Sequence, residues 1–425
     1  MTVLLVSARG PQGASNGTVT VGTGVGTQGN YNASSYGGNS ALAVAAALSA
    51  SKRVTLLPDS HTFATPVTVS QDDATIEGYG ATITPTSTTT STGQLFEVTG
   101  DGVRILGGRV NLTQFTESQY VIRGNSADQL LVSDLVVDDQ IAPGSYTNAM
   151  VLFRMDGCNS PVLRNNHVMP NKGLQVYYGR SCYSMTIDNP MTGEKWTDST
   201  LCDAVYMFND CTHSLVRGGY AFGLGTSGSK LSYVMRAWNT SGSVHHVRID
   251  GGYYETIMVS RAFQVEGGRH AEFENMSVAS FTETDVGIFC AIGSTGDATG
   301  TAVTNFELQN IRSHDNSKAG TNGALLYGRL ATRVFMQNCR HLEAYSQMSR
   351  MDTTNVNTFL AYDNVATSSQ ASASFVTQDA STYIGSASTT NWRMRNCYAF
   401  GSGSNGFQKW HTTAPTGADV SDCGP

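Results

Sequence analysis

Two acidic residues have the type and spacing expected of the acid and base that break a glycosidic bond. Asp210 and Glu266 each stand at the end of a short run in which apolar and polar residues alternate. If those runs are strands two coils apart in a stack, the two residues are separated by roughly 10 Å along it. Inverting glycosidases hold their carboxyl groups about 6.5–9.5 Å apart, with water between them. The two side chains could lean into that range, so Glu266 and Asp210 are our acid/base candidates.

Neighbouring acidic residues leave alternatives open. Asp203 is a further catalytic candidate, which could pair with Asp210 in place of Glu266. Asp210 could also simply fill a tight turn, because Asp tolerates the left-handed backbone that Gly and Asn adopt there. Asp156 lies four coils from Glu266 in the same register, which is too far for the two to act on one bond.

The runs that must position these residues repeat along the chain. Each places apolar residues first and third, places polar, charged or aromatic residues second and fourth, and stops at Gly, Asp or Asn. This pattern predicts a strand with one buried and one exposed face. The five clearest runs are Phe153–Gly157, Gln175–Gly179, Tyr206–Asp210, Met235–Asn239 and Phe263–Gly267.

The exposed side of these runs carries groups that suit sugars. Aromatic rings cover the apolar face of a sugar, while carboxylate, amide and guanidinium groups bond its hydroxyls. An ordinary solvated face, partly covered by a subunit contact, is the alternative. Trp196 and Glu255 lie in segments that precede two of the runs. Trp196 could stack on a sugar, or it could pack on the base of its loop. The candidate substrate-binding residues on the runs are Arg154, Asp156, Tyr178, Asn209, Arg236, Trp238 and Gln264.

Turn residues recur in two columns, and a third strand follows the second column. Three strands per repeat, spaced by roughly 22 to 35 residues, predict a coiled parallel β-structure. The longest insertion within the repeated coils is 188–203. Asn side chains stacked at one corner can bond one another along the axis. We place the first column at Gly124, Gly157, Gly179, Asp210, Asn239 and Gly267. We place the second at Gly107, Asn165, Gly218, Asp250, Asn275, Asn310, Asn338, Asn364 and Asn396.

A single helix is expected near the start of the coils. Asn39 and Ser40 can cap Ala41–Ala50, whose Ala-rich sequence favours a helix that is apolar nearly all round. We interpret residues 1–30 as a leader, either flexible or ordering on a partner. Residues 31–400 are expected to form the coiled domain with its cap, and residues 401–425 a short tail.

The sequence resembles the pectate-lyase-like right-handed parallel β-helix proteins. The resemblance is carried by the Ala-rich helix, the strand Val54–Pro58, the segment Thr75–Gly78 and the Asn/Gly turn repeat. Within that group, the element Gly10–Gly13 and the absence of a secretion signal are most similar to bacteriophage tailspikes. The resemblance implies an all-β, right-handed parallel β-helix of three-strand coils with a short N-terminal capping α-helix.

The same resemblance implies a function and partners. Tailspikes of this kind are homotrimers in the virion that bind, and often cleave, surface polysaccharide of the host bacterium. Residues 1–30 would dock to phage tail or baseplate proteins. Three alternatives remain: a receptor-binding tail protein without catalysis, a polysaccharide lyase, and a structural adhesin or assembly protein. A lyase is expected to carry a calcium-binding carboxylate cluster, and no Asp-x-Asp accompanies Arg154 or Arg236.

The composition argues against several other classes. A formal net charge of -7 argues against nucleic acid as the main partner. No apolar run matches a signal peptide or a membrane span, so we expect synthesis in the host cytoplasm without a signal and no membrane insertion. The 8 cysteines include no CxxC pair and are expected to be reduced structural thiols. His245–His246 lacks partners at ligand spacing, so no metal or other cofactor is expected.

Overall fold

The structure is a computed structural model of the chain, which divides into two compact units, Met1–Met169 and Pro170–Pro425. It describes residues 18–423 apart from internal gaps. The gaps are 25–28, 87–93, 113–119, 139–150, 170–174, 194–203, 225–230, 239–245, 258, 282–286, 293–300, 315, 317–323, 345–346, 352–355, 369–375, 379–390, 401–407 and 410–418.

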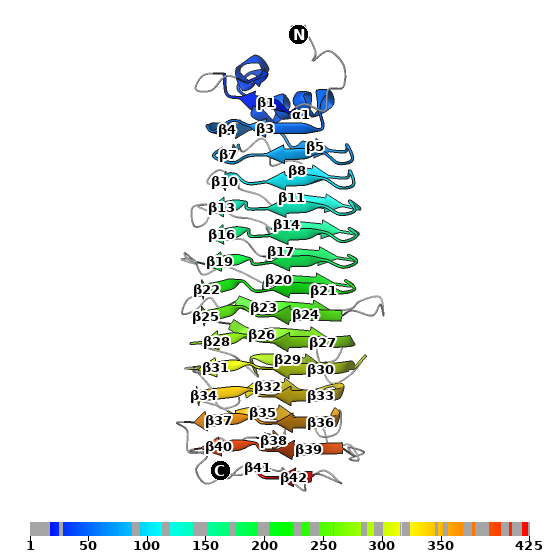
Figure 1. Ribbon diagram of the computed structural model, residues 1–425, viewed down its shortest axis with the longest axis vertical. Coiled ribbons are helices and arrows are strands. Elements are labelled where there is room, and N and C mark those ends of the chain that lie inside the picture. The colour runs from blue at the N-terminus through cyan, green and yellow to red at the C-terminus, as the bar shows by residue number, and fades with distance from the viewer. Residues whose placement is uncertain are drawn as a thin grey trace. The chain divides into compact units, whose positions relative to one another are not determined.

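The first unit begins with a cap built from local sequence signals. Helix α1 (Ser40–Ala50) starts where the Asn39 side chain accepts a hydrogen bond from the Ala41 backbone N–H at 3.1 Å. One face of the helix, which includes Ala43, Val44 and Leu48, is buried, and the helix contacts strands of all three sheets of the first coil, at the blue end of the chain in Figure 1. The predicted capping helix is therefore confirmed.

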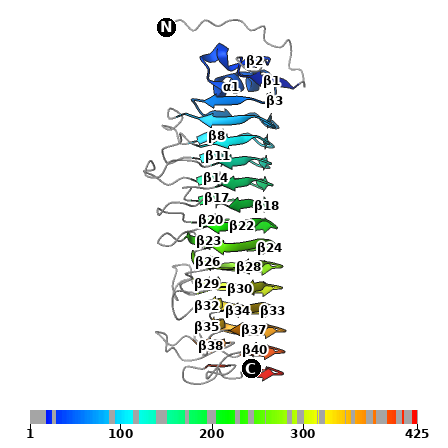
Figure 2. The same cartoon turned by 90° about the vertical axis from the view of Figure 1, so that its left-hand side faces the viewer.

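The rest of the first unit forms three parallel sheets that the chain visits in turn (Figures 1 and 2). Sheet A contains β2 (Tyr31–Asn32), β1 (Val19–Gly22), β3 (Arg53–Leu56), β6 (Thr75–Glu77), β9 (Arg104–Leu106), β12 (Leu131–Ser133) and β15 (Val162–Arg164), and a 3-10 helix (Ala33–Tyr36) follows β2. Sheet B contains β4 (Ser60–Phe63), β7 (Thr82–Pro85), β10 (Arg109–Asn111), β13 (Val136–Asp138) and β16 (His167–Met169). Sheet C contains β5 (Val67–Val69), β8 (Gln94–Val98), β11 (Tyr120–Asn125) and β14 (Val151–Asp156).

The second unit repeats the same order of sheets. Its sheet A contains β18 (Thr186–Asp188), β21 (Ser214–Arg217), β24 (His246–Asp250), β27 (Gly268–Glu274), β30 (Val303–Gln309), β33 (Ala331–Gln337), β36 (Val356–Tyr362), β39 (Asn391–Arg395) and β42 (Asp419–Ser421). Sheet B contains β19 (Met191–Gly193), β22 (Tyr220–Leu224), β25 (Tyr253–Ile257), β28 (Ser277–Ala279), β31 (Arg312–His314), β34 (Arg340–Ala344), β37 (Val365–Ser368) and β40 (Tyr398–Phe400). Sheet C contains β17 (Gln175–Arg180), β20 (Ala204–Asn209), β23 (Leu231–Trp238), β26 (Val259–Glu266), β29 (Phe289–Ile292), β32 (Ala324–Gly328), β35 (Gln347–Met351), β38 (Val376–Gln378) and β41 (Gln408–Lys409).

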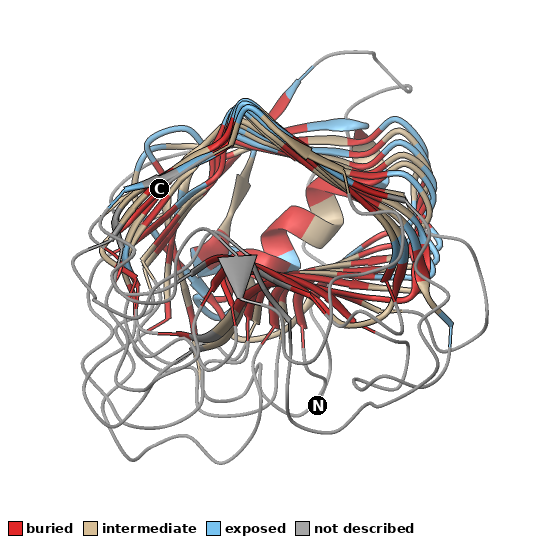
Figure 3. Ribbon diagram, turned by 90° about the horizontal axis from the view of Figure 1, so that it is seen from below, coloured by how far each residue is buried: buried red, intermediate tan, exposed pale blue. Residues whose placement is uncertain are grey.

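Alternation of side chains explains why these short strands form a solenoid. In β27, for example, Ala271 and Phe273 are buried while His270, Glu272 and Glu274 are only partly covered. The buried side chains line the interior, and Figure 3 shows red segments along all three sides of the coils. Inside the second unit, Phe263 stacks on Phe289 with ring centroids 4.9 Å apart. The predicted fold class, an all-β parallel β-helix with a short helix, is confirmed.

The predicted Asn column exists and its side chains bond one another. Asn275, Asn310 and Asn338 have left-handed backbones, with φ of 57°, 54° and 50°. The Asn338 amide donates to Asn310 Oδ1 at 2.9 Å, and Asn310 donates to Asn275 Oδ1 at 3.0 Å. Each asparagine therefore bonds the asparagine of the neighbouring coil. This ladder of asparagines fixes the register between the coils. Two members of the column were misplaced by one residue, because the left-handed positions are Gly251 and Asp363 rather than Asp250 and Asn364.

Two predicted turns in the first column are also wrong. Gly124 and Gly179 lie inside β11 and β17, and the left-handed turns come two residues later, at Ser126 and Ser181. These glycines face the interior, where a Cβ on Gly179 would lie 2.6 Å from the sulfur of Met185. They are glycine because the interior leaves no room for a side chain, and not because the chain turns there.

Strands form within three segments that the sequence analysis set apart from the regular coils. Val19–Gly22, inside the predicted leader, pairs with β3, and Val21 is fully buried. Asp419–Ser421, inside the predicted tail, pairs with β39. Within the predicted insertion 188–203, Met191–Gly193 is a strand that pairs with β22. Among the described residues, none of the helices is long and apolar enough to cross a membrane.

The described cysteines are thiols rather than disulfides, and most of them are fully buried. Burial raises the pKa of the Cys290 and Cys339 thiols to about 12. Cys339 Sγ donates to the Gln337 carbonyl at 3.4 Å, which satisfies the thiol without a disulfide. The expectation of structural thiols agrees with this arrangement for every described cysteine, while Cys202 lies outside the described residues.

The Asn ladder should contribute measurably to stability. Replacing Asn310 by Ala puts a residue that disfavours the left-handed backbone into this turn and removes a hydrogen bond on each side, so we expect a loss of about 2 kcal/mol in the free energy of unfolding. Asn310→Gly removes the same bonds without the backbone strain and should lose about half as much. Guanidinium unfolding of both variants checks this, and equal losses would contradict it.

The buried thiols should be unreactive in the folded chain. Alkylation requires the thiolate, and a pKa of about 12 leaves almost none at pH 8. We expect iodoacetamide to modify Cys290 and Cys339 more than about a hundredfold more slowly in native protein than in protein unfolded with about 6 M guanidinium. Peptide mapping by mass spectrometry measures both rates, and equal rates would show that these thiols are exposed.

Candidate functional site

The outer face of sheet C in the second unit carries half of the predicted site residues. Register pairing aligns them in two rows that run across the strands β17, β20, β23 and β26. The first row is Tyr178, Met207, Arg236 and Gln264. The second row is Arg180, Asn209, Trp238 and Glu266. We call these eight residues, with Tyr233 and Arg261, the sheet C cluster.

The pairing corrects one part of the predicted register. The sequence placed Tyr178 in the same row as Asn209 and Trp238, because Gly179 was taken as a turn. Tyr178 instead opposes Met207, and Arg180 occupies the place opposite Asn209. The tyrosine nevertheless reaches the cluster, since its ring centroid lies 6.2 Å from that of Trp238.

An ion pair between neighbouring strands forms the centre of the cluster. Arg236 donates from Nε to Glu266 Oε1 at 2.6 Å and from its terminal nitrogen to Oε2 at 3.1 Å. Gln264 also donates to Glu266 Oε1, at 2.5 Å. Both carboxylate oxygens are therefore engaged, and a two-pronged contact of this kind fixes the guanidinium plane.

Aromatic rings hold the same guanidinium from the other side. The Arg236 Cζ lies 4.8 Å from the Trp238 ring centroid and 5.1 Å from that of Tyr233. Such cation–π contacts add to the ion pair and orient the rings. Trp238, Tyr178 and Arg236 remain partly exposed. The cluster therefore presents an indole, a phenol and a guanidinium at the surface of one sheet.

Glu266 and Gln264 are not on an exposed face, contrary to expectation. Glu266 is 2% exposed and Gln264 is fully buried. The outer positions on the next two strands are also buried, and they are apolar or sulfur-bearing: Cys290, Ile292 and Tyr327. A general acid must reach the bond that it protonates. In this structure Glu266 instead positions Arg236.

Asp210 and Asn209 occupy the turn and strand end beside Trp238. Asp210 has φ of 52°, and its backbone N–H donates to the Trp238 carbonyl at 3.0 Å. It therefore fills the left-handed turn position, as the simpler alternative proposed. Asn209 ends β20, and its Oδ1 is a buried acceptor for which the described residues supply no hydrogen-bond donor.

The remaining predicted residues fall elsewhere. Glu255 belongs to sheet B, where it accepts hydrogen bonds from the hydroxyls of Tyr220 and Tyr253. The bond to Glu255, together with burial, raises the pKa of Tyr220 to about 12. Glu255 thus lies on a different sheet from Glu266. Trp196 and Asp203 lie outside the described residues.

Arg154 and Asp156 form a similar cluster on sheet C of the first unit. Arg154 Nε donates to both Asp156 oxygens, at 2.8 and 3.0 Å, and its terminal nitrogen donates to the Tyr120 hydroxyl at 2.6 Å. Arg123, opposite Arg154 on the neighbouring strand, donates to Asp156 at 3.2 Å. Hydrogen bonds among these side chains hold them in place. They form a second polar surface, which belongs to the first unit and is distinct from the sheet C cluster.

Apart from Arg123, Arg180 and Met207, which are register partners of predicted residues, sequence reasoning missed three residues of these clusters. Tyr233 and Tyr120 stack on arginines, and Arg261 donates to Gln264 Oε1 at 3.2 Å. All three lie at or near the starts of strands, before the alternating pattern that the sequence analysis used. A tyrosine three residues before Arg236 was the available signal. Among the described residues, the group that gathers to metal-binding distance is on sheet A, and it is described below.

Comparisons with known proteins show the fold. No protein-family model and no curated protein matches the chain. Among solved structures, the catalytic domain of a GH87 alpha-1,3-glucanase in complex with tetrasaccharides is similar over 88% of this chain and 65% of that one, with a TM-score of 0.55 and 11% identity. The chain therefore spans a little less than two thirds of that structure's length.

Two other solved structures match with lower scores. The A-module of a mannuronan C-5 epimerase from Azotobacter vinelandii covers 91% of this chain and 94% of its own, with a TM-score of 0.44 and 14% identity. Tailspike protein 3 of bacteriophage CBA120 covers 91% of this chain and 59% of its own, with a TM-score of 0.41 and 8% identity.

The buried ion pair should make Arg236 critical for stability. Arg236→Ala would leave the Glu266 carboxylate buried without its cation, and we expect a loss of about 3–5 kcal/mol in the free energy of unfolding. The matched control is Arg395→Ala, which removes the exposed pair with Asp419 and should lose less than about 1 kcal/mol. Denaturant unfolding compares the two variants, and similar losses would contradict the central place given to Arg236.

Proposed function

We propose that this chain binds a polysaccharide on the outer face of sheet C in the second unit. The observation that carries the proposal is the surface formed by Trp238, Tyr178 and Arg236, which are held together by the contact of Arg236 with Glu266. Aromatic rings stack on the apolar face of a sugar, and a guanidinium donates to its hydroxyl, carboxylate or phosphate groups.

The narrower proposal is a bacteriophage tailspike that binds surface polysaccharide of its host bacterium. It is supported by the sequence resemblance and agrees with the fold. On this proposal the chain is a homotrimer in the virion and attaches to tail or baseplate proteins through residues 1–30. A receptor-binding tail protein without catalysis is favoured by the burial of Glu266.

Hydrolysis of the bound polysaccharide is the second candidate function. It is favoured by carboxyl groups on coils two apart, Asp210 after β20 and Glu266 on β26. For it to occur, Glu266 would have to become accessible when the sugar binds. The lyase alternative has less support, because Arg236 is committed to Glu266 and is not free to remove a proton.

Binding should depend on the indole. We expect Trp238→Ala to weaken binding to the recognised polysaccharide by roughly tenfold to thirtyfold, since a stacking aromatic is a typical binding hot spot. Trp238→Phe should retain most of the affinity. Tyr398→Ala, at an exposed aromatic on sheet B, is the matched control. A panel of purified bacterial capsular and lipopolysaccharide glycans, measured by biolayer interferometry, identifies the ligand, and unchanged binding by Trp238→Ala would refute the site.

Catalysis is tested on the same glycan by size-exclusion chromatography. Asp210→Asn keeps a residue that suits the left-handed turn, and Glu266→Gln keeps a side chain that can bond Arg236. If the chain is a hydrolase, wild-type protein shortens the glycan and at least one of these variants, or Asp203→Asn, loses that activity. Binding without any shortening by wild-type protein would instead identify a pure receptor-binding protein.

A further inference from the structure

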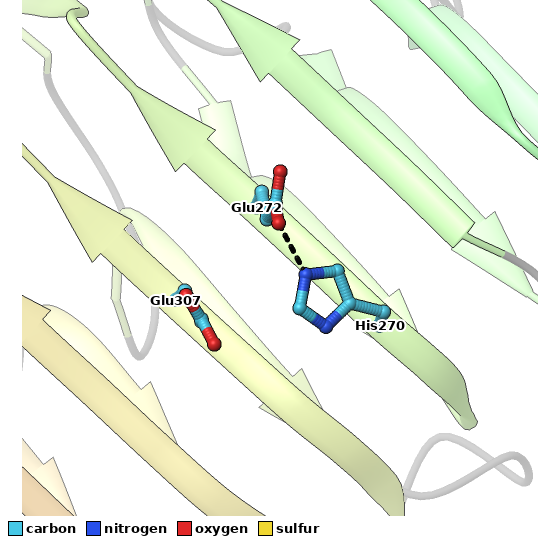
Figure 4. A group of neighbouring side chains, drawn as sticks. All are labelled: His270, Glu272 and Glu307. Atoms are coloured by element: carbon cyan, nitrogen blue, oxygen red, sulfur yellow. Dashed lines mark hydrogen bonds and ion pairs between the residues drawn. The ribbon is translucent and has the colours of Figure 1, made fainter.

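Three metal-ligand side chains from two strands meet on the outer face of sheet A. His270 and Glu272 lie two residues apart on β27, so their side chains leave the strand on the same side. Glu307 on β30 is the register partner of Glu272. One ligand atom from each of the three residues lies within 4.8 Å of the others, and Figure 4 shows His270 in contact with Glu272 on one strand and Glu307 on the next strand.

The two glutamates are an unfavourable pair when considered alone. Like charges directly opposite each other on neighbouring strands destabilise a sheet. Here the His270 ring nitrogen Nε2 lies 2.5 Å from Glu272 Oε1 (Figure 4). A bound cation would relieve the repulsion between Glu272 and Glu307 and would use the His270 nitrogen that already contacts Glu272.

Neighbouring side chains hold both carboxylates in place. Arg248 Nε lies 3.5 Å from Glu272 Oε2, on the opposite side from the histidine. Arg333 lies 3.3 Å from Glu307 Oε1, and Gln309 donates to Glu307 Oε2 at 3.3 Å. In metal sites such outer partners orient the ligands and raise affinity. The cluster is therefore partly pre-organised.

Exposure is in the range that a surface metal site needs. The side chains of His270, Glu272 and Glu307 are 24%, 31% and 14% exposed. An ion can reach them from solvent, while their freedom to turn away is limited. A second imidazole is close, because His246 is the register partner of His270 and their ring centroids lie 5.9 Å apart.

We propose that His270, Glu272 and Glu307 bind a divalent transition-metal ion of the Zn²⁺ class. One imidazole and two carboxylates form a donor set that suits Zn²⁺ better than Ca²⁺, which takes oxygen ligands alone. Zinc holds nitrogen and oxygen at about 2.0–2.2 Å, which places ligand atoms roughly 3–4 Å apart. Small side-chain rotations would close the cluster to that size, with water as the fourth ligand.

The ion would link two successive coils. The ligands lie on β27 and β30, which also pair through their backbones. An ion that binds only the folded chain stabilises it in proportion to the logarithm of ion concentration. The proposed role is thus a cross-link of the solenoid on sheet A, away from the sheet C cluster, and it does not depend on the function proposed above.

Calorimetric titration of the EDTA-treated full chain with ZnCl2 tests the site. We expect wild-type protein to bind one ion, and His270→Ala and Glu307→Gln each to weaken binding at least tenfold. Glu274→Gln is the matched control, because Glu274 lies on the same face of the same strand and contacts Arg248 but lies outside the cluster. His314→Ala, on sheet B, controls for loss of any histidine.

A second measurement keeps the test valid if a variant folds poorly. Co²⁺ bound by nitrogen and oxygen ligands gives a visible absorption band, which should appear with wild-type protein and Glu274→Gln and should be absent with His270→Ala. Thermal unfolding should shift upward with Zn²⁺ concentration only in proteins that keep the site. Equal zinc affinity in wild-type, His270→Ala and Glu307→Gln proteins would overturn the proposal, as would tighter binding of Ca²⁺ than of Zn²⁺.

Discussion

In-register pairing of parallel strands is the constraint on which the side-chain clusters depend. Adjacent coils are about 4.8 Å apart, so a residue lies beside its register partner on the next coil even when many residues separate them in sequence. The ladder through Asn275, Asn310 and Asn338 maintains that register at one corner. A slip of one residue would reverse every face. It would separate Arg236 from Glu266 and would also turn Glu307 toward the interior.

The solenoid places charged residues in two different environments. On sheet C, Glu266 is almost fully buried, and its charge is compensated by Arg236 and a hydrogen bond from Gln264. A buried charge without such partners would be costly, which explains why both carboxylate oxygens are engaged. On sheet A, Glu272 and Glu307 are partly exposed and are paired with arginines at longer distances. Water screens these charges, so they remain available to an added ion.

The outer face of sheet C changes character along the second unit. Between β17 and β23 its side chains include Tyr178, Arg236 and Trp238, which are partly exposed. On β26, β29 and β32 the outer positions Gln264, Glu266, Cys290, Ile292 and Tyr327 are buried, and they become apolar or sulfur-bearing on β29 and β32. Buried strands of this kind are hydrophobic on both faces, whereas half-exposed strands alternate. The exposed polar surface is therefore bounded on one side by the buried Glu266.

The sequence by itself determined the repeating strands, the capping helix and most of the corner residues. Alternation of apolar residues and the left-handed preference of Asn and Gly are local properties, and they can be read without knowing what lies on the next coil. The error at Gly179 has a tertiary cause, because that glycine makes room for the Met185 side chain inside the coil. Only the tertiary structure decided that Glu266 is buried against Arg236 and that His270 meets Glu307. Both facts depend on which coils become neighbours and on what covers each face. Neither can be inferred from the alternation within a single strand.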